Sequence, residues 1–101
     1  MYRGTTPPFT IVTDFDYSVL KEVWVTFKQD DLEITKTKKD IVINGCEIVV
    51  ELTQEETLQF KHDRPMRIQA RRLTQDDKAF ATNIAKAYVG EILKEGVIGN
   101  E

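Results

Sequence analysis

Two runs of β-branched and aliphatic residues, separated by Asn44-Gly45, form the clearest pattern in the chain. Asn and Gly tolerate positive φ better than other residues, so this dipeptide between apolar runs predicts a tight β-hairpin over residues 40–52. With Asn44-Gly45 as a two-residue loop, Ile43 would lie opposite Cys46. Residues that pair directly share a face of the sheet, so one face of this hairpin would be apolar throughout. Its members would be Ile41, Ile43, Cys46, Ile48, Val50 and Leu52.

Alternation of apolar and polar residues predicts a second hairpin earlier in the chain. In residues 22–28 every second side chain from Val23 to Phe27 is apolar, which leaves Trp24 on the polar face. With Asp30-Asp31 as the turn, Phe27 would pair with Ile34. Trp24 would then either be covered by another loop or by the tail, or be an exposed contact for a partner.

Two further segments alternate in the same way. Residues 9–13 are typical of an edge strand or first strand, and residues 66–71 predict a strand whose outer face carries Arg67 and Arg71. Between the first two strands, Asp14–Ser18 predicts a loop or a single helical turn. The segment Thr53-Gln-Glu-Glu56 fits a capping box, so one turn of helix is expected over residues 53–58, where it would carry the chain from one sheet to the other.

The last third of the chain supports two interpretations. Apolar residues recur every four positions from Phe80 to Ile92, which favours an amphipathic helix at about 77–94. Alternatively, residues 75–78 form a turn and residues 79–89 pair back on residues 66–73, because that strand otherwise lacks an antiparallel neighbour from its own sequence. We therefore expect an all-β fold, an immunoglobulin-like antiparallel β-sandwich of about seven strands with one short crossover helix. An α+β fold with the C-terminal helix is the alternative.

Length and charge limit this picture further. A chain of 101 residues fits one domain, spanning residues 1–101, that is large enough to bury a core. Its formal net charge is −3 with acidic and basic residues interleaved, which argues against general binding of nucleic acid or membranes. No apolar run approaches the roughly 20 residues of a membrane span, and the first residues lack the pattern of a signal peptide.

The residues that could carry chemistry form no recognisable catalytic or metal-binding pattern. Cys46, the only cysteine, falls on the predicted apolar face, where it would pack as a small hydrophobic residue rather than act as a reactive thiol. His62 has no second histidine or nucleophile nearby in sequence and is expected on a surface loop. Glu55 and Glu56 would not converge on a substrate from one turn of helix. We therefore expect no catalysis, no metal and no cofactor.

Two resemblances add to this reading. Residues 52–60 resemble the crossover between the fifth and sixth strands of immunoglobulin-type domains, where a similar L-T-x-E-D-T segment precedes an aromatic residue. Short motifs along nearly the whole chain resemble those of small uncharacterised proteins from prophages and phage-like elements of Gram-positive bacteria. In chain order they are Arg3-Gly-Thr-Thr-Pro7, Lys28-Gln29, Asn44-Gly45, Leu52–Thr57, Arg64-Pro65 and Gly90–Ile98.

The second resemblance implies a function. Those proteins resemble virion components encoded among tail and baseplate genes, and they are similar in style to the β-sandwich domains of baseplate proteins. The family has no catalytic residues to carry over, and its final region looks like a hairpin. The resemblance therefore implies a phage or prophage virion structural or assembly protein that acts through protein–protein contacts. It also implies a location in the host cytoplasm during assembly and then in the virion, with other phage structural proteins or further copies of this chain as partners.

The candidate partner contacts are Trp24, Arg67 and Arg71, because aromatic residues and arginine are enriched at interfaces. Open edge strands would offer a second mode of contact, by strand addition. The alternative function is a carbohydrate-binding module, in which an exposed Trp24 would stack on a sugar ring. Such a module needs a planar cluster of aromatic residues, and this chain has one Trp and three Tyr spread widely.

Overall fold

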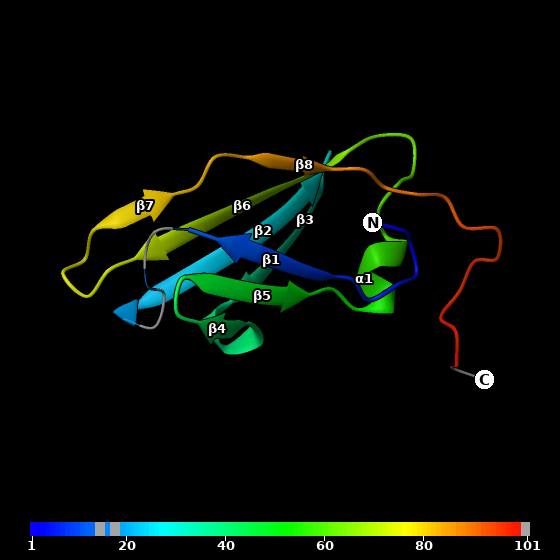
Figure 1. Ribbon diagram of the computed structural model, residues 1–101. Helices are drawn as coiled ribbons and strands as arrows, with labels where there is room; N and C mark the ends of the chain where they lie inside the picture. Colours follow the sequence, from blue (N-terminus) through cyan, green and yellow to red (C-terminus); the bar gives the residue numbers. More distant parts are fainter. Residues whose placement is uncertain (14–15, 17–18, 100–101) are drawn as a thin grey trace.

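Two antiparallel sheets pack face to face in the computed structural model (Figure 1), which describes the chain except for residues 14–15, 17–18 and 100–101. The smaller sheet has the strand order β1 (Pro8–Val12), β5 (Glu47–Glu51), β4 (Val42–Asn44). In the larger sheet, β3 (Leu32–Thr37), β2 (Glu22–Gln29) and β6 (Met66–Leu73) lie side by side, and β7 (Ala79–Ala81) and β8 (Ala85–Ala87) both pair with β6. The predicted antiparallel β-sandwich is confirmed. The expected loop or turn at Asp14–Ser18 lies outside the described residues.

The order of the strands resembles the immunoglobulin arrangement with two differences, which are the place of β2 and the presence of an eighth strand, β8, beside β6. In immunoglobulin domains the first, second, fifth and fourth strands form one sheet, and the third, sixth and seventh form the other. Here β1, β5 and β4 keep the first grouping and β3, β6 and β7 keep the second, but β2 lies between β3 and β6. This position makes β2 a central strand of the larger sheet.

Alternate residues of β2 form the centre of the core. Val23, Val25 and Phe27 are completely buried, and the Phe27 ring lies 5.1 Å from the ring of Phe9 on β1. Most of the buried apolar residues come from the two sheets, because each sheet covers the apolar face of the other, and the rest come from segments next to the strands. The buried apolar residues are Leu20, Val23, Val25, Phe27, Ile48, Val50, Leu52, Phe60, Met66, Ile68, Ala70 and Val89.

The hairpin formed by β2 and β3 has the predicted register. Phe27 pairs with Ile34, and Lys28 pairs with Glu33. Asp30 has a φ of 54°, a left-handed conformation that Asp adopts more readily than most residues. The turn at Asp30-Asp31 therefore forms without glycine.

The hairpin at residues 40–52 forms, but its turn lies one residue later than predicted. Ile43 pairs with Ile48, and Gly45 and Cys46 make the turn. Gly45 has a φ of 60°, as in hairpin turns that carry glycine at the first central position. Ile43 and Ile48 still point inward, because moving the pairing by two residues preserves the alternation. The prediction that Cys46 packs in the core was wrong, since the turn leaves it exposed.

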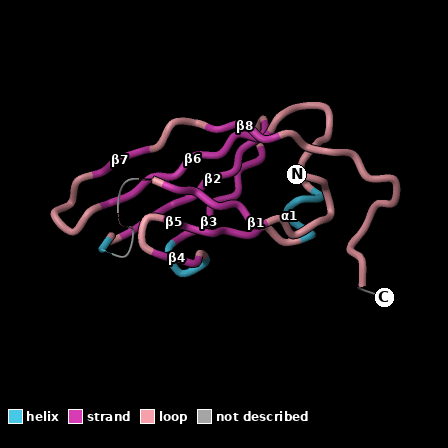
Figure 2. The backbone as a smooth tube through the Cα atoms, viewed as in Figure 1, coloured by secondary structure: helices cyan, strands magenta, loops and turns pink. Residues whose placement is uncertain are grey.

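The last third of the chain forms strands rather than the alternative helix at about 77–94. Figure 2 shows strand and loop, without helix, in the described chain from β6 onward. β7 pairs with the end of β6 and β8 with its beginning. Between them, Thr82 interrupts the ladder: its N–H donates to the Ala70 carbonyl (2.9 Å), and its hydroxyl accepts from the Ala70 N–H (3.1 Å). Pairing with β6 thus outweighs the helical spacing of the apolar residues.

The predicted capping box begins a short helix, α1 (Gln54–Leu58), between β5 and β6. The Thr53 hydroxyl accepts from the Glu56 N–H (3.1 Å), and the Glu56 carboxylate accepts from the Thr53 N–H (2.8 Å). Lys36 on β3 also pairs with Glu56, at 2.8 Å. Burial raises the pKa of Glu56, but the hydrogen bonds from Lys36 and from the Thr53 backbone outweigh it, so the net pKa lies below the ordinary value.

This pKa predicts a pH dependence of stability. A glutamate with a lower pKa in the folded state stabilises the fold above its ordinary pKa of about 4.3, and this contribution is lost as the pH falls through the folded-state value. Glu56→Gln keeps the capping hydrogen bond but removes the charge. Denaturation between pH 3 and pH 7 should therefore show a smaller gain of stability with pH in Glu56→Gln than in the wild type. Glu55→Gln, at the exposed neighbour, is the matched control and should follow the wild type. Equal pH profiles for all three proteins would contradict this prediction.

The N-terminal segment and the tail cover one end of the sandwich, near α1 (Figure 1). Arg3 ties these parts together, and its side chain is 15% exposed. Its guanidinium donates to the carbonyl oxygens of Phe60 (2.6 Å) and Leu58 (2.8 Å). A third hydrogen bond reaches the Glu95 carboxylate in the tail (2.5 Å), and the Arg3 backbone N–H donates to the Gly90 carbonyl (3.2 Å).

Candidate functional site

The three candidate contact residues all lie on the outer face of the larger sheet. Side chains alternate between the two faces of a strand, and the buried residues Val25 and Phe27 define the inner side. Trp24 on β2 therefore points outward, together with Arg67 and Arg71 on β6, and all three are exposed. We call this surface the outer face; besides these three it carries Glu22, Thr26, Lys28, Glu33, Thr35, Thr37, Gln69, Leu73, Ala79, Ala81 and Lys86.

Trp24 and Arg71 form a pair across the two central strands. Their backbones pair directly, and the Arg71 guanidinium carbon lies 5.6 Å from the centre of the Trp24 ring. A cation over an indole face at this distance contributes about 0.5–1 kcal/mol at an exposed site. Trp24 still keeps 45% of its surface exposed. Arg71 therefore covers part of the ring and leaves the rest accessible.

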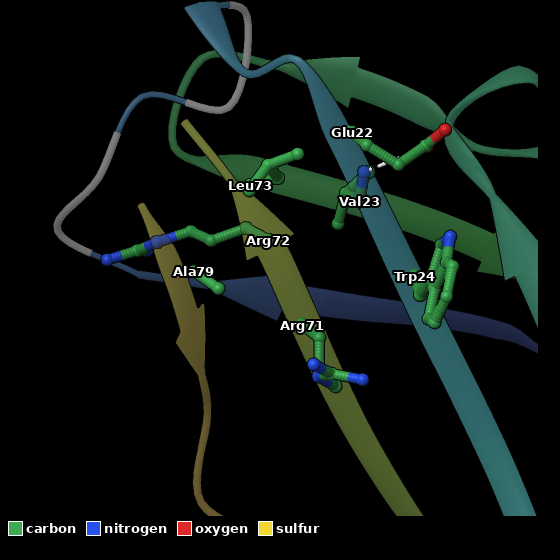
Figure 3. A pocket seen from close by; sticks show the side chains of 7 residues that line it. All are labelled: Glu22, Val23, Trp24, Arg71, Arg72, Leu73 and Ala79. Carbon is green, nitrogen blue, oxygen red and sulfur yellow. Dashed lines mark hydrogen bonds between the residues drawn. The ribbon is translucent and has the colours of Figure 1, made fainter. Parts of the chain in front are cut away.

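A shallow hollow of about 170 Å³ lies beside this pair. Figure 3 shows Trp24 and Arg71 on neighbouring strands at one side of it, with Arg72 extending away from them. Leu73 and Ala79 add apolar surface, and Glu22 supplies a carboxylate, although one of its oxygens accepts the Val23 N–H (2.9 Å). An apolar hollow between an arginine and a carboxylate could accept a partner's side chain that has an apolar body and a polar end.

Arg67 lies away from the hollow, in a row of positive charges. Lys28 on β2 pairs with Arg67, and Arg67 pairs in turn with Lys86 on β8. Like charges directly opposite each other destabilise a sheet, and Glu33 stands opposite Lys28 at one end of this row. Within the described part of the chain, none of the three cations forms an ion pair. We call Lys28, Arg67 and Lys86 the cationic row.

The other residues considered for chemistry are dispersed. His62 lies on the loop before β6, half exposed, with its Nε2 atom 3.9 Å from the Glu91 carboxylate. Cys46 lies in the β4–β5 turn, and Glu56 is engaged in the capping box. Among the residues that the structure describes, no group of three His, Cys, Asp or Glu side chains is arranged to hold a metal ion. The helices described are also too short, and insufficiently apolar, to cross a membrane.

Comparison with family models, with curated proteins and with solved structures finds no match for this chain.

Sequence reasoning identified the exposed tryptophan and the outward arginines, but it missed part of the surface around them. Alternation along each strand was enough to orient Trp24, Arg67 and Arg71. The hollow needed the β7 register, which brings Ala79 opposite Leu73. The cationic row needed the β8 register, because Lys86 comes beside Arg67 only after the break at Thr82. Both the hollow and the cationic row depend on residues 77–94 pairing as strands rather than forming a helix. These were the two alternatives that the sequence left open.

Proposed function

We propose that this protein is a structural or assembly protein that works by protein–protein contact through its outer face, without catalysis. The single observation that carries the proposal is the exposed Trp24–Arg71 pair beside an apolar hollow. Tryptophan and arginine dominate the binding energy of many interfaces when they stand next to a pocket. The sequence motifs that resemble those of prophage proteins support the tail or baseplate region of a phage particle as the place where this protein acts.

Incorporation into particles tests this proposal. Cells that carry the prophage encoding this protein would be induced to release phage particles. The particles would be purified, and the amount of this protein in them would be measured by mass spectrometry. We expect the wild-type protein to co-purify with the particles and Trp24→Ala/Arg71→Ala to be at least about tenfold depleted, since hot-spot truncations cost about 2 kcal/mol or more each. Tyr88→Ala removes an aromatic side chain that is 74% exposed outside the hollow and is the matched control. A protein absent from the particles, or a double variant incorporated like the wild type, would overturn the proposal.

A carbohydrate-binding module is the second candidate, and the exposed Trp24 ring favours it. Two features argue against it: the Arg71 guanidinium occupies part of the ring that a sugar would need, and among the residues that the structure describes no second exposed aromatic side chain belongs to the outer face near Trp24. Tyr88 lies one position beyond Ala87, which pairs with Met66, so it is roughly 20 Å along β6 from Arg71. Binding on a glycan array that disappears in Trp24→Ala would establish this function in place of protein contact.

A further inference from the structure

The smaller sheet has an outer face of the opposite charge. Glu47 and Glu51 on β5 point outward and are exposed, and β1, β5 and β4 contain no lysine or arginine. Neither carboxylate takes part in an ion pair among the described residues. Three outward valines lie between and beside them: Val12, Val42 and Val49. Val12 and Val42 are each 65% exposed. We call this surface the acidic face.

The two faces also match in spacing. Glu47 and Glu51 are four residues apart on β5, and Arg67 and Arg71 are four residues apart on β6. Both pairs lie on extended strands, so each pair spans about 13 Å. Sheets that stack face to face keep their strands within about 30° of each other. A β5 strand laid over a β6 strand would therefore bring both carboxylates opposite both guanidinium groups.

We propose that the occupant of the outer face is a second copy of this chain, which contributes its acidic face. Glu47 and Glu51 of one copy meet Arg67 and Arg71 of the next, and the exposed valines pack towards Trp24 and the hollow. Bidentate contacts between arginine and carboxylate have the geometry that such a stack requires. The inference rests on the proposed function, since it names the partner of the same surface.

Charge decides which faces of the two copies meet. The outer face carries four cationic side chains against two acidic ones, so two outer faces repel each other. Two acidic faces repel for the same reason. The contact is therefore head to tail, and contacts of this kind extend into rings or filaments rather than closing as a symmetric dimer. A three-stranded face of about 14 Å by 17 Å is smaller than most stable interfaces, so each contact is weak and favoured by high local concentration.

Sedimentation velocity of the purified protein tests this inference through charge reversal and charge exchange. We expect the wild type to associate at low salt, with a sedimentation coefficient that rises with protein concentration and falls when salt is added. Arg67→Glu/Arg71→Glu and Glu47→Arg/Glu51→Arg should each associate at least tenfold more weakly, because like charges would then face each other across the contact. An equimolar mixture of the two variants should recover association, since each then offers a face complementary to the other.

The controls separate this contact from general charge effects and from the proposed function. Lys61→Glu/Lys94→Glu changes the net charge by the same amount as Arg67→Glu/Arg71→Glu, but at exposed positions outside both faces. This variant should associate like the wild type. Circular dichroism checks that every variant is folded. A wild type that stays monomeric at low salt and about 1 mM overturns the inference, and so does a mixture that does not recover association. If the cationic row then binds an acidic peptide or a nucleic acid, that molecule, and not a second copy, is the partner. A protein found in particles that does not self-associate would keep the proposed function and overturn only the second copy as partner.

Discussion

Replacing Phe27 with alanine is expected to lower the free energy of unfolding by about 3–5 kcal/mol, because the loss of a buried aromatic side chain removes apolar contacts and leaves a cavity. Phe27 is completely buried on a central strand, and its ring packs against Phe9 of the opposite sheet. A domain of this size is typically stable by about 5–15 kcal/mol, so the change removes a large part of the total.

Denaturation by urea, followed by the fluorescence of the single tryptophan, measures this effect. Phe80→Ala is the matched control. Phe80 is 46% exposed and has the Arg72 guanidinium 5.0 Å from its ring centre, so its loss should cost no more than about 1 kcal/mol. Similar losses in the two variants would mean that Phe27 is not at the centre of the core.

Replacing Arg3 with alanine should cost about 2–3 kcal/mol, because hydrogen bonds from a charged group contribute about 1.5–3 kcal/mol and the carbonyl oxygens of Leu58 and Phe60 would lose their donor. The side chain is largely buried, so water can replace the guanidinium only in part. The same change releases the contact with Glu95, and the tail after residue 90 should become easier to displace.

Two companion variants isolate the role of the guanidinium group. Arg3→Lys keeps the charge but lacks the fork that reaches both carbonyl oxygens, so it should recover little of the lost stability. Glu95→Gln weakens only a half-exposed ion pair and should change the free energy of unfolding by less than about 1 kcal/mol. Denaturation and hydrogen exchange at the end of α1 would measure these effects. An Arg3→Ala protein as stable as the wild type would contradict the role assigned to this residue.

The elements with strong local chemistry could be predicted from the sequence. The alternation in residues 22–37 gave the observed register of β2 and β3, and the capping box gave the start of α1. The turn of the second hairpin could not be predicted to the residue, because Gly45 can serve either as the second or as the first of two central turn residues. Both choices keep Ile43 and Ile48 inside, and they differ chiefly in whether Cys46 is inside or in the turn. Such a choice depends on packing between the sheets rather than on local preference.

The candidate site was predictable only where a single strand determines it. Alternation is a local property, so the outward direction of Trp24 and Arg71 followed from the sequence. Which strands lie next to each other is a property of the whole fold, and helical spacing in the last third competed with strand pairing there. The cationic row and the match between the two outer faces appear only once β5, β6 and β8 are placed.

The interruption at Thr82 has a consequence for how the molecule can meet other molecules. An uninterrupted edge strand is a template on which further strands add without limit, and proteins commonly block this with breaks and bulges. Here the edge beside β6 is divided into two pieces of three residues each, with the Thr82 hydroxyl occupying a backbone N–H in between. This edge is thus a poor starting point for amyloid-like growth, because neither piece is long enough to template a continuous added strand.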